Sequence, residues 1–264
     1  PNFPNILSSN NYQELYVKRN KWLNKFKVAE IFDAKTIDDA LNEPINLNRK
    51  QRPITAPHFS IRACVNNPNS NEIETTIQSE IQSKAEEIVK NYIQPLQYCN
   101  IGNASVMVID NKKNEVVAYV GSSDFFNSAH QGEVDGVKAI RSPGSTLKPL
   151  LYGLAIDYGL ITPKMKVPDV PITFGGYTPG NYDDKCRGLI TIEQALALSL
   201  NIPAVSILNQ VGVSDFVKVM VSCGFRQVKK DQNKLGLSAI LGGCGVRLEE
   251  LTNLFSMFAK GGLY

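Results

Sequence analysis

Ser145 and Lys148 stand three residues apart and form the only Ser-x-x-Lys sequence in the chain. On a helix, residues i and i+3 share a face, so the serine hydroxyl and the lysine amine come within reach of each other. A serine hydroxyl is a weak nucleophile until a neighbouring base removes its proton. A lysine can be that base once burial or nearby positive charge brings its pKa down from ~10.4 towards neutrality. The pair therefore predicts acyl transfer through a covalent serine intermediate.

The residue after the pair predicts an irregular helix start. If Ser145 caps an α-helix, the first intrahelical hydrogen bond would come from Pro149, which has no N–H. The first turn is then short of hydrogen bonds, an irregularity of the kind that occurs at functional sites. Free N–H groups at such a helix start would also stabilise an oxyanion beside the serine.

A second polar pair follows at Ser199-Leu200-Asn201. Ser-x-Asn alone carries little information, since Ser8-Ser9-Asn10 has the same form. Its placement is more informative, because Thr191 and Gln194 form a capping box at a helix start and Pro203 suits the first turn of another helix. Ser199 and Asn201 are therefore predicted at a helix–helix junction, where short polar side chains can point into a cleft; a polar C-cap and turn is the alternative interpretation.

The segment around Ser145 resembles the transpeptidase domain of class A penicillin-binding proteins, whose nucleophile lies in Ser-Pro-Gly-Ser-Thr-x-Lys-Pro, the pattern of residues 142–149. Residues 118–127 and 134–137 resemble the family's preceding strand, turn and connection, and residues 174–182 resemble its aromatic–Pro–Asn–Tyr loop. The resemblance implies that Ser145 is the nucleophile, Lys148 its proton partner, Ser199 a proton relay and Asn201 a ligand for Lys148 and the substrate amide. It also implies substrate-binding roles for Gly144, Tyr177 and Asn181.

The elements that position these residues predict an α+β fold. Helices are expected over residues 12–29, from Thr36 with Asp39 as its capping partner, and over residues 77–92. The runs 104–110 and 115–121 predict a hairpin, and the chain after Ser145 is mostly helical. Through the resemblance, the fold is expected to be the penicillin-binding and serine β-lactamase-like one, an antiparallel sheet with helices whose later strands lie outside this chain. A proline-marked linker at 43–57 predicts a boundary near residue 60.

Composition excludes several classes of function. The chain has 264 residues, is 43% hydrophobic and carries a net charge of +3, which is too mild and too scattered to predict binding to nucleic acid or to a membrane surface. No run approaches the ~18 apolar residues of a membrane-spanning helix. The five cysteines are widely spaced and most are expected to be buried, and the two histidines are far apart, so neither a zinc site nor any cofactor is expected.

The family's third motif, Lys-Thr/Ser-Gly on a strand, is not found in this sequence. Lys260-Gly261-Gly262 looks similar but follows an amphipathic helix, so it is predicted to be the C-cap of that helix. Because the chain begins with Pro1 and stops before that motif, we expect it to be a fragment that is inactive alone. Residues 1–60 resemble the tail of a glycosyltransferase domain and its linker, and residues 61–264 the first part of the transpeptidase domain.

The resulting hypothesis is a peptidoglycan D,D-transpeptidase that acts on stem peptides ending in D-Ala-D-Ala and is acylated by β-lactams. One alternative is a D,D-carboxypeptidase or β-lactamase-like hydrolase, although no Ser-Asp-Asn or activating glutamate is evident. The other is a non-catalytic penicillin-recognising sensor or scaffold. The full-length protein is expected to be membrane-anchored, at the periplasmic face of the bacterial inner membrane.

Overall fold

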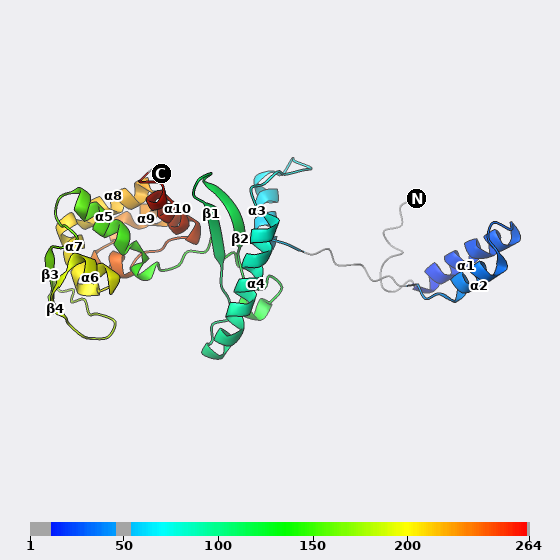
Figure 1. The fold of residues 1–264 in the computed structure, drawn as a ribbon, viewed down its shortest axis with the longest axis horizontal. Coiled ribbons are helices and arrows are strands. Elements are labelled where there is room, and N and C mark those ends of the chain that lie inside the picture. Colours follow the sequence, from blue (N-terminus) through cyan, green and yellow to red (C-terminus); the bar gives the residue numbers. More distant parts are fainter. Residues whose placement is uncertain (1–11, 46–53, 263–264) are drawn as a thin grey trace. The chain divides into compact units, whose positions relative to one another are not determined.

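The chain forms two compact units, Pro1–Ile54 and Thr55–Tyr264. The computed structural model describes residues 12–45 and 54–262 (Figure 1). The division lies between residues 54 and 55, several residues before the boundary predicted near residue 60. Helix α3 (Pro57–Asn66) therefore belongs to the second unit, where it contacts strand β2. The two units are described separately.

The N-terminal unit contains two contacting helices, α1 (Tyr12–Val28) and α2 (Ala34–Asn42). Helix α2 begins two residues earlier than predicted, because Asp33 rather than Thr36 is its N-cap. The Asp33 carboxylate accepts the backbone N–H of Thr36 at 2.9 Å. The hydroxyl of Thr36 donates to the same carboxylate, and this bond, followed by the backbone N–H bond, holds the pKa of Asp33 below its usual range. Arg19 of α1 donates to the carbonyl of Leu41 at 2.8 Å and so binds the C-terminal end of α2.

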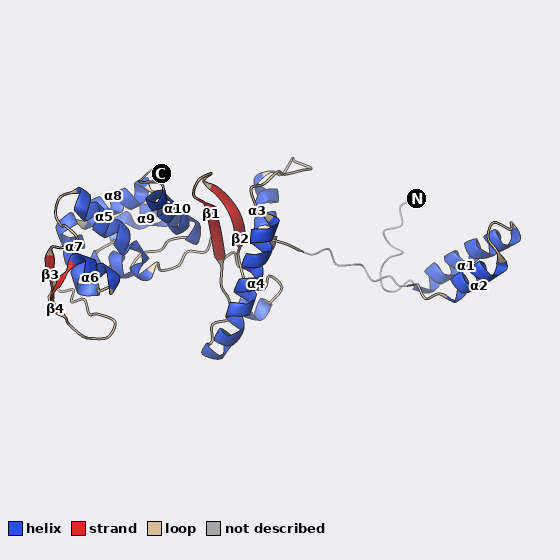
Figure 2. Cartoon of the chain, viewed as in Figure 1, coloured by secondary structure: helices blue, strands red, loops and turns tan. Residues whose placement is uncertain are grey.

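A hairpin and a long helix form the first part of the second unit. Strands β1 (Val106–Asp110) and β2 (Glu115–Val120) pair antiparallel and form the predicted hairpin, which has an irregularity after Val108 that was not predicted. Helix α4 (Ser79–Leu96) packs against β2 (Figure 2). The Gln82 side chain of α4 pairs with the backbone of Tyr119, donating to its carbonyl at 3.0 Å and accepting its N–H at 2.7 Å. The helix thus covers the outer edge of β2 with an amide that acts like a neighbouring strand.

The rest of the unit is mostly helical and surrounds one large apolar core. Its helices are α5 (Lys148–Asp157), α6 (Ile192–Ala197), α7 (Asn201–Val211), α8 (Val213–Ser222), α9 (Arg226–Asp231) and α10 (Leu248–Ala259). The short strands β3 (Lys166–Asp169) and β4 (Gly188–Thr191) pair antiparallel. Single 3₁₀ turns are η1 (Gln97–Cys99), η2 (Ser128–His130), η3 (Gly144–Leu147), η4 (Gln232–Lys234) and η5 (Leu237–Leu241). Helix α7 lies at the centre and contacts α5, α6, α8, β3 and η5.

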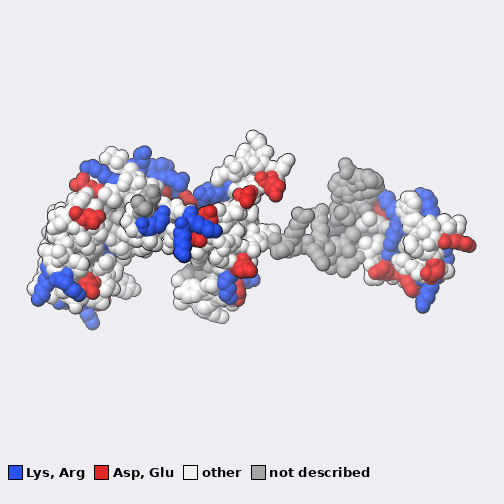
Figure 3. Space-filling model, turned by 45° about the horizontal axis from the view of Figure 1, so that its top comes forward, with Lys and Arg blue, Asp and Glu red and all other residues white. Residues whose placement is uncertain are grey.

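Helix α10 packs against β1 and joins the hairpin part to the helical part, together with polar contacts. Arg62 of α3 pairs with Glu249 of α10 at 2.7 Å, with both side chains largely buried. Arg141 and Val246 form an antiparallel bridge directly before η3, with both N–H···O distances at 2.9 Å. Outside such buried contacts, acidic and basic side chains are interspersed over the surface (Figure 3). Exposed pairs such as Lys84–Glu87 each contribute only ~0–1 kcal/mol.

No single described helix is long and apolar enough to cross a membrane. Helices α7 and α8 pass the length and composition test only as a pair that is bent by 89°. Both contribute buried residues to the core, among them Ala204, Leu208 and Phe216.

Candidate active site

Ser145 lies in a one-turn 3₁₀ helix, η3, that leads directly into α5. The backbone N–H of Lys148 donates to the carbonyl of Ser145 across this turn. Because side chains at i and i+3 eclipse in a 3₁₀ helix, the turn places Ser145 and Lys148 on one side. The helix start is irregular, as predicted, but Ser145 is not an α-helix cap: the 3₁₀ bond needs no donor from Pro149, which occupies the first turn of α5, where a proline costs nothing.

Lys148 is the charged group at the centre of the site. Its side chain is only 1% exposed. The amine donates to the carbonyl oxygen of Ser199 at 2.6 Å, to Asn201 Oδ1 at 2.8 Å and to Ser199 Oγ at 3.3 Å. Burial lowers the pKa of Lys148 from its usual 10.5 to about 8. This is the direction that a lysine base requires, since the neutral amine is the proton acceptor.

Ser199 sits at the end of α6 with a left-handed backbone, φ +53°. Its N–H donates to the carbonyl of Leu196, and the next N–H, of Leu200, donates to Ala195. These two bonds define a Schellman motif with Ser199 at the C′ position, where glycine is the usual residue. A serine there carries ~1–3 kcal/mol of backbone strain, which occurs mainly at functional sites.

Asn201 is the first residue of α7, so the predicted helix–helix junction is confirmed. Its side-chain Nδ2 donates to the carbonyl of Gly180 at 2.8 Å, which leaves Oδ1 facing Lys148. The capping box of Thr191 and Gln194 at the start of α6 is also present. The junction between α6 and α7 and the start of α5, about fifty residues apart in the sequence, therefore meet at the Lys148 amine.

A close contact between Gly144 and Gly242 fixes the backbone directly before Ser145. Gly144 has φ +56°, and Gly242, which ends η5, has φ +98°. A Cβ at Gly242 would lie 2.4 Å from Ser142 Oγ and 2.9 Å from Gly144 Cα. Ser142 Oγ also donates to the carbonyl of Gly242 at 2.8 Å. No local pattern predicts this contact, because the two segments lie a hundred residues apart.

Tyr177 and Asn181, two of the residues predicted to bind substrate, lie partly or fully inside the protein. Tyr177 is half-buried and packs against the core of the helical part. Asn181 is 6% exposed, and its amide nitrogen donates to Asp169 at 2.8 Å and to the carbonyl of Lys185 at 2.9 Å. Its oxygen accepts the N–H of Asn201 at 2.8 Å. The polar atoms of Asn181 are therefore engaged inside the protein.

Ser145 itself is exposed, and among the described residues its hydroxyl has no hydrogen-bond partner. The four predicted catalytic residues divide into an exposed nucleophile and a hydrogen-bonded group in which the buried Lys148 contacts the exposed Ser199 and the half-buried Asn201. Loose nucleophile–base geometry is common in unliganded acyl-transfer sites, which tighten when substrate binds.

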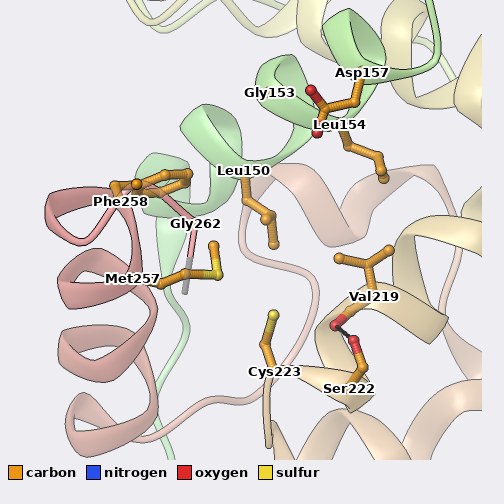
Figure 4. Close-up of a pocket in the computed structure, with 11 residues that line it drawn as sticks. Leu150, Gly153, Leu154, Asp157, Val219, Ser222, Cys223, Met257, Phe258 and Gly262 are labelled. Carbon is orange, nitrogen blue, oxygen red and sulfur yellow. Dashed lines mark hydrogen bonds between the residues drawn. The ribbon is translucent and has the colours of Figure 1, made fainter. Parts of the chain in front are cut away.

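A cavity of about 580 Å³ lies on the opposite face of α5. Figure 4 shows Leu150 and Leu154 of α5 pointing into it, across from Cys223 and Met257. Residues 150, 153, 154 and 157 share one side of the helix, about half a turn away from Lys148. None of the four predicted catalytic residues lines this cavity, so its volume says nothing about the acyl-transfer site.

Within the described ranges, no group of three or more His, Cys, Asp or Glu side chains could hold a metal ion. No described cysteine forms a disulfide. Cys223 and Cys244 are buried, whereas Cys64, Cys99 and Cys186 are exposed, contrary to the expectation that most would be buried. Lys260 is the C-cap of α10 and is followed by two left-handed glycines, as predicted; its amine donates to Asn114 Oδ1 at 3.0 Å.

Comparison with known proteins decides the family. Residues 104–262 match the penicillin binding protein transpeptidase domain. The chain belongs to the penicillin-binding protein transpeptidase family. It is 36% identical over 244 residues to penicillin-binding protein 1C of Escherichia coli, covering 92% of this chain and 31% of that protein. It is 32% identical over 195 residues to penicillin-binding protein 1F of Bacillus subtilis, covering 73% of this chain and 26% of that protein.

Solved structures agree on the fold. Penicillin-binding protein 1A from Haemophilus influenzae superposes with a TM-score of 0.70 at 14% identity, over 97% of this chain and 53% of that one. The penicillin-binding protein PonA1 from Mycobacterium tuberculosis superposes with a TM-score of 0.65 at 21% identity, over 79% of this chain and 57% of that one. The chain thus has the penicillin-binding transpeptidase fold that the sequence predicts, and it spans less than a third of the curated relatives it matches.

Proposed function

We propose that this chain carries the acyl-serine site of a peptidoglycan D,D-transpeptidase, with Ser145 as the nucleophile and Lys148 as its base. One observation supports the proposal most strongly. A lysine that is almost fully buried, with its pKa lowered to about 8, lies one 3₁₀ turn from an exposed serine and contacts Ser199 and Asn201. A buried amine with a lowered pKa next to a free hydroxyl is what serine acylation at neutral pH requires.

The hydrogen bonds of Lys148 indicate where its lone pair would point. The carbonyl oxygen of Ser199 and Oδ1 of Asn201 can only accept, so each keeps one N–H of the amine. A neutral amine has two N–H groups and one lone pair. Its lone pair is therefore left for a hydroxyl, that of Ser145 or that of Ser199, which can both donate and accept.

The reaction then runs in two steps. Ser145 Oγ attacks the carbonyl of the penultimate D-Ala while its proton passes to Lys148, and the C–N bond to the terminal D-Ala breaks. Ser199, hydrogen-bonded to Lys148, returns that proton to the departing amine. An amine of a second stem peptide attacks the Ser145 ester, which forms the cross-link and releases the serine. Asn201 holds the lysine and the substrate amide.

Labelling with a penicillin tests the nucleophile. One structural relative is PonA1 from Mycobacterium tuberculosis in complex with penicillin V. For the present protein, at the full length that its gene encodes, we expect a fluorescent penicillin to form an ester on Ser145, located by peptide mass spectrometry. Ser145→Ala should abolish the adduct, and Ser222→Ala, an exposed serine far along the chain, should not. An adduct on another residue, or none, would contradict the proposal.

The acceptor is tested separately. Incubation with a D-Ala-D-Ala donor peptide, with and without an amine acceptor, distinguishes cross-linking from hydrolysis. A transpeptidase gives the amide product when the amine is present, whereas a carboxypeptidase gives only the shortened acid. Labelling of Ser145 without either product would favour the sensor or scaffold hypothesis.

We further propose that the N-terminal unit is the end of a glycosyltransferase domain and that the full-length protein is anchored at the periplasmic face of the inner membrane. The match to penicillin-binding protein 1C extends over 92% of the chain and so reaches beyond residues 104–262. Fractionation of cells, with protease access from the periplasm, tests the location. Recovery of the protein from the cytoplasm would contradict it.

A further inference from the structure

Asp169 is a fully buried carboxylate behind the proposed site. It ends β3 and is 0% exposed. Its Oδ1 accepts Asn181 Nδ2 at 2.8 Å, and its Oδ2 accepts the backbone N–H of Arg187 at 2.8 Å. No described residue forms an ion pair with this carboxylate. Both of its hydrogen-bond donors are neutral groups, and the Arg187 guanidinium interacts with it only through space. Burial of a carboxylate is costly, so a carboxylate at this position indicates that two acceptor oxygens are required there.

The first consequence concerns the orientation of Asn181. A carboxylate only accepts hydrogen bonds, and so does the carbonyl of Lys185. Both of these acceptors therefore hold the amide nitrogen of Asn181, and its oxygen is forced to the other side. There the oxygen accepts the N–H of Asn201 at 2.8 Å and that of Ile202 at 3.4 Å.

These are the first N–H groups of α7, which the helix cannot satisfy itself. The N-cap residue is Leu200, whose side chain has no acceptor. Asn181 therefore supplies the missing cap from a different segment of the chain. Helix α7 contains Asn201 as its first residue, so the cap fixes the position of the site's amide.

The same segment also fixes the orientation of Asn201. The carbonyl of Gly180, next to Asn181, accepts Asn201 Nδ2 at 2.8 Å. Since that carbonyl can only accept, Oδ1 of Asn201 must face Lys148, from which it accepts at 2.8 Å. In this series each residue donates to the next. The Lys148 amine donates to Asn201 Oδ1, the backbone N–H of Asn201 donates to Asn181 Oδ1, and Asn181 Nδ2 donates to the carboxylate of Asp169.

We propose that Asp169 is a positioning residue for acylation: through the Asn181 amide it fixes the start of α7 and thereby the contact of Asn201 with Lys148. This rests on the proposed function, because it concerns the same lysine. A residue that only held the loop in place would affect the free energy of unfolding and not the acylation rate constant. A positioning residue also affects the acylation step, and only while Asn201 is there to transmit the effect.

Asp169→Asn is the sharpest substitution, because it keeps the shape and replaces one acceptor by a donor. The new amide nitrogen must face either Asn181 Nδ2 or the N–H of Arg187, and in the first case Asn181 flips and turns its own nitrogen towards α7. Glu250→Gln is the control: Glu250 is another buried carboxylate that accepts two backbone N–H groups, although it also lies 3.8 Å from Nε of Arg226. Glu250 is 5% exposed and accepts the backbone N–H groups of Arg226 at 3.2 Å and Arg247 at 3.1 Å, away from the site.

The measurement is fluorescent-penicillin acylation of the full-length protein over a range of drug concentrations, which separates reversible binding from the first-order acylation rate constant. We expect Asp169→Asn to lower that rate constant about tenfold, equivalent to ~1.4 kcal/mol. Glu250→Gln should change it less than about twofold at a comparable loss of Tm. In an Asn201→Ala background, Asp169→Asn should lower the acylation rate constant by a further factor of less than about two.

Three results would overturn the inference: an unchanged acylation rate constant in Asp169→Asn, an equal loss in Glu250→Gln, or a full tenfold loss on top of Asn201→Ala. If Asp169→Asn does not fold, Asn181→Ala replaces it in the double-mutant cycle with Asn201→Ala. The same changes in the acylation rate constant are then expected. An unlabelled wild-type protein would instead overturn the proposed function, and this inference with it. A labelled wild type with an indifferent Asp169 variant overturns only the inference.

Discussion

The amine of Lys148 lies 2.6 Å from the carbonyl oxygen of Ser199, the residue of the site whose backbone is left-handed, with φ +53°. The two facts are related. At the C′ position of α6 the chain leaves the helix direction, so the Ser199 carbonyl is free of the helix and can accept from the lysine. Its hydroxyl is carried to the same amine, 3.3 Å away. The backbone strain and the contact with the proposed base come from one local conformation.

Ser199→Gly should separate stability from activity. Glycine adopts φ > 0 without strain, so we expect the variant to melt no lower than the wild type despite its lost hydroxyl. Without that hydroxyl, proton transfer to the leaving amine is impaired, and cross-linking should fall by roughly 10²- to 10⁴-fold. Thermal unfolding and product formation from a donor peptide measure the two effects.

Ser199→Ala is the control for this prediction. It removes the same hydroxyl but keeps a Cβ in the left-handed conformation. Its free energy of unfolding should therefore be ~1 kcal/mol lower than that of Ser199→Gly, and its cross-linking activity should be equally low. Equal melting of the two variants would mean that the backbone at this position carries no strain. Full activity in either would exclude the hydroxyl from the proton path.

The lowered pKa of Lys148 predicts the pH dependence of acylation. Burial lowers this pKa from 10.5 to about 8, and the neutral amine is the base. The acylation rate constant should therefore rise with pH and level off above about 8, whereas Lys148→Arg, which stays protonated, should be slow at every pH. Stopped-flow acylation with a fluorescent penicillin measures the profile; a flat one would remove Lys148 as the base.

The same pKa has a consequence for stability. Between about 8 and 10.5 the unfolded chain binds a proton at Lys148 that the folded chain has released. Stability therefore rises with pH across this window, and below it the cost of the buried charge is present in full. In Lys148→Met this contribution disappears. Denaturant unfolding of both proteins at pH values inside and below the window should show the difference in slope.

Gly242→Ala should displace the backbone before the nucleophile. The added Cβ would lie 2.4 Å from Ser142 Oγ and 2.9 Å from Gly144 Cα, at a residue with φ +98°. We expect lower thermal stability and slower acylation, since a ~1 Å displacement can cost on the order of 10²-fold in rate. Gly153→Ala is the matched control, because a Cβ there meets nothing within 4 Å in the interior of α5. It should raise stability by up to ~1 kcal/mol. Similar behaviour of the two variants would contradict the close contact.

Local patterns predicted much of the fold and the identity of the site. The hairpin, the capping box at Thr191 and the C-cap at Lys260 depend on short-range rules, and each is in place. The motifs around Ser145 and Ser199 likewise identified the lysine and its neighbours. Failures occurred where one local rule competed with another. Asp33 and Thr36 are both good caps, and a Ser-x-x-Lys turn can be 3₁₀ as well as α.

Long-range contacts could not be predicted. Asp169, Asn181 and Asn201 lie on three separate segments, and nothing in their spacing shows that the first two fix the third. Residues 174–182 resemble a loop of the family, but the sequence does not show which helix this loop caps. An apolar residue at a helix N-cap, here Leu200, is the one local sign that a cap must come from elsewhere.

Gln82 tests the fold away from the site. Its buried amide bonds both the N–H and the carbonyl of Tyr119 on β2, and it is 0% exposed. Gln82→Leu keeps the volume but leaves two buried backbone groups without partners, each costing ~1–3 kcal/mol. We expect a loss of roughly 2–4 kcal/mol in urea unfolding. Lys84→Ala, which removes an exposed ion pair on the same helix, should change stability by less than ~0.5 kcal/mol. A loss of stability in Gln82→Leu as small as that of Lys84→Ala would mean that water can hydrogen-bond the backbone of Tyr119 in place of the amide. Helix α4 would then not exclude water from the edge of β2.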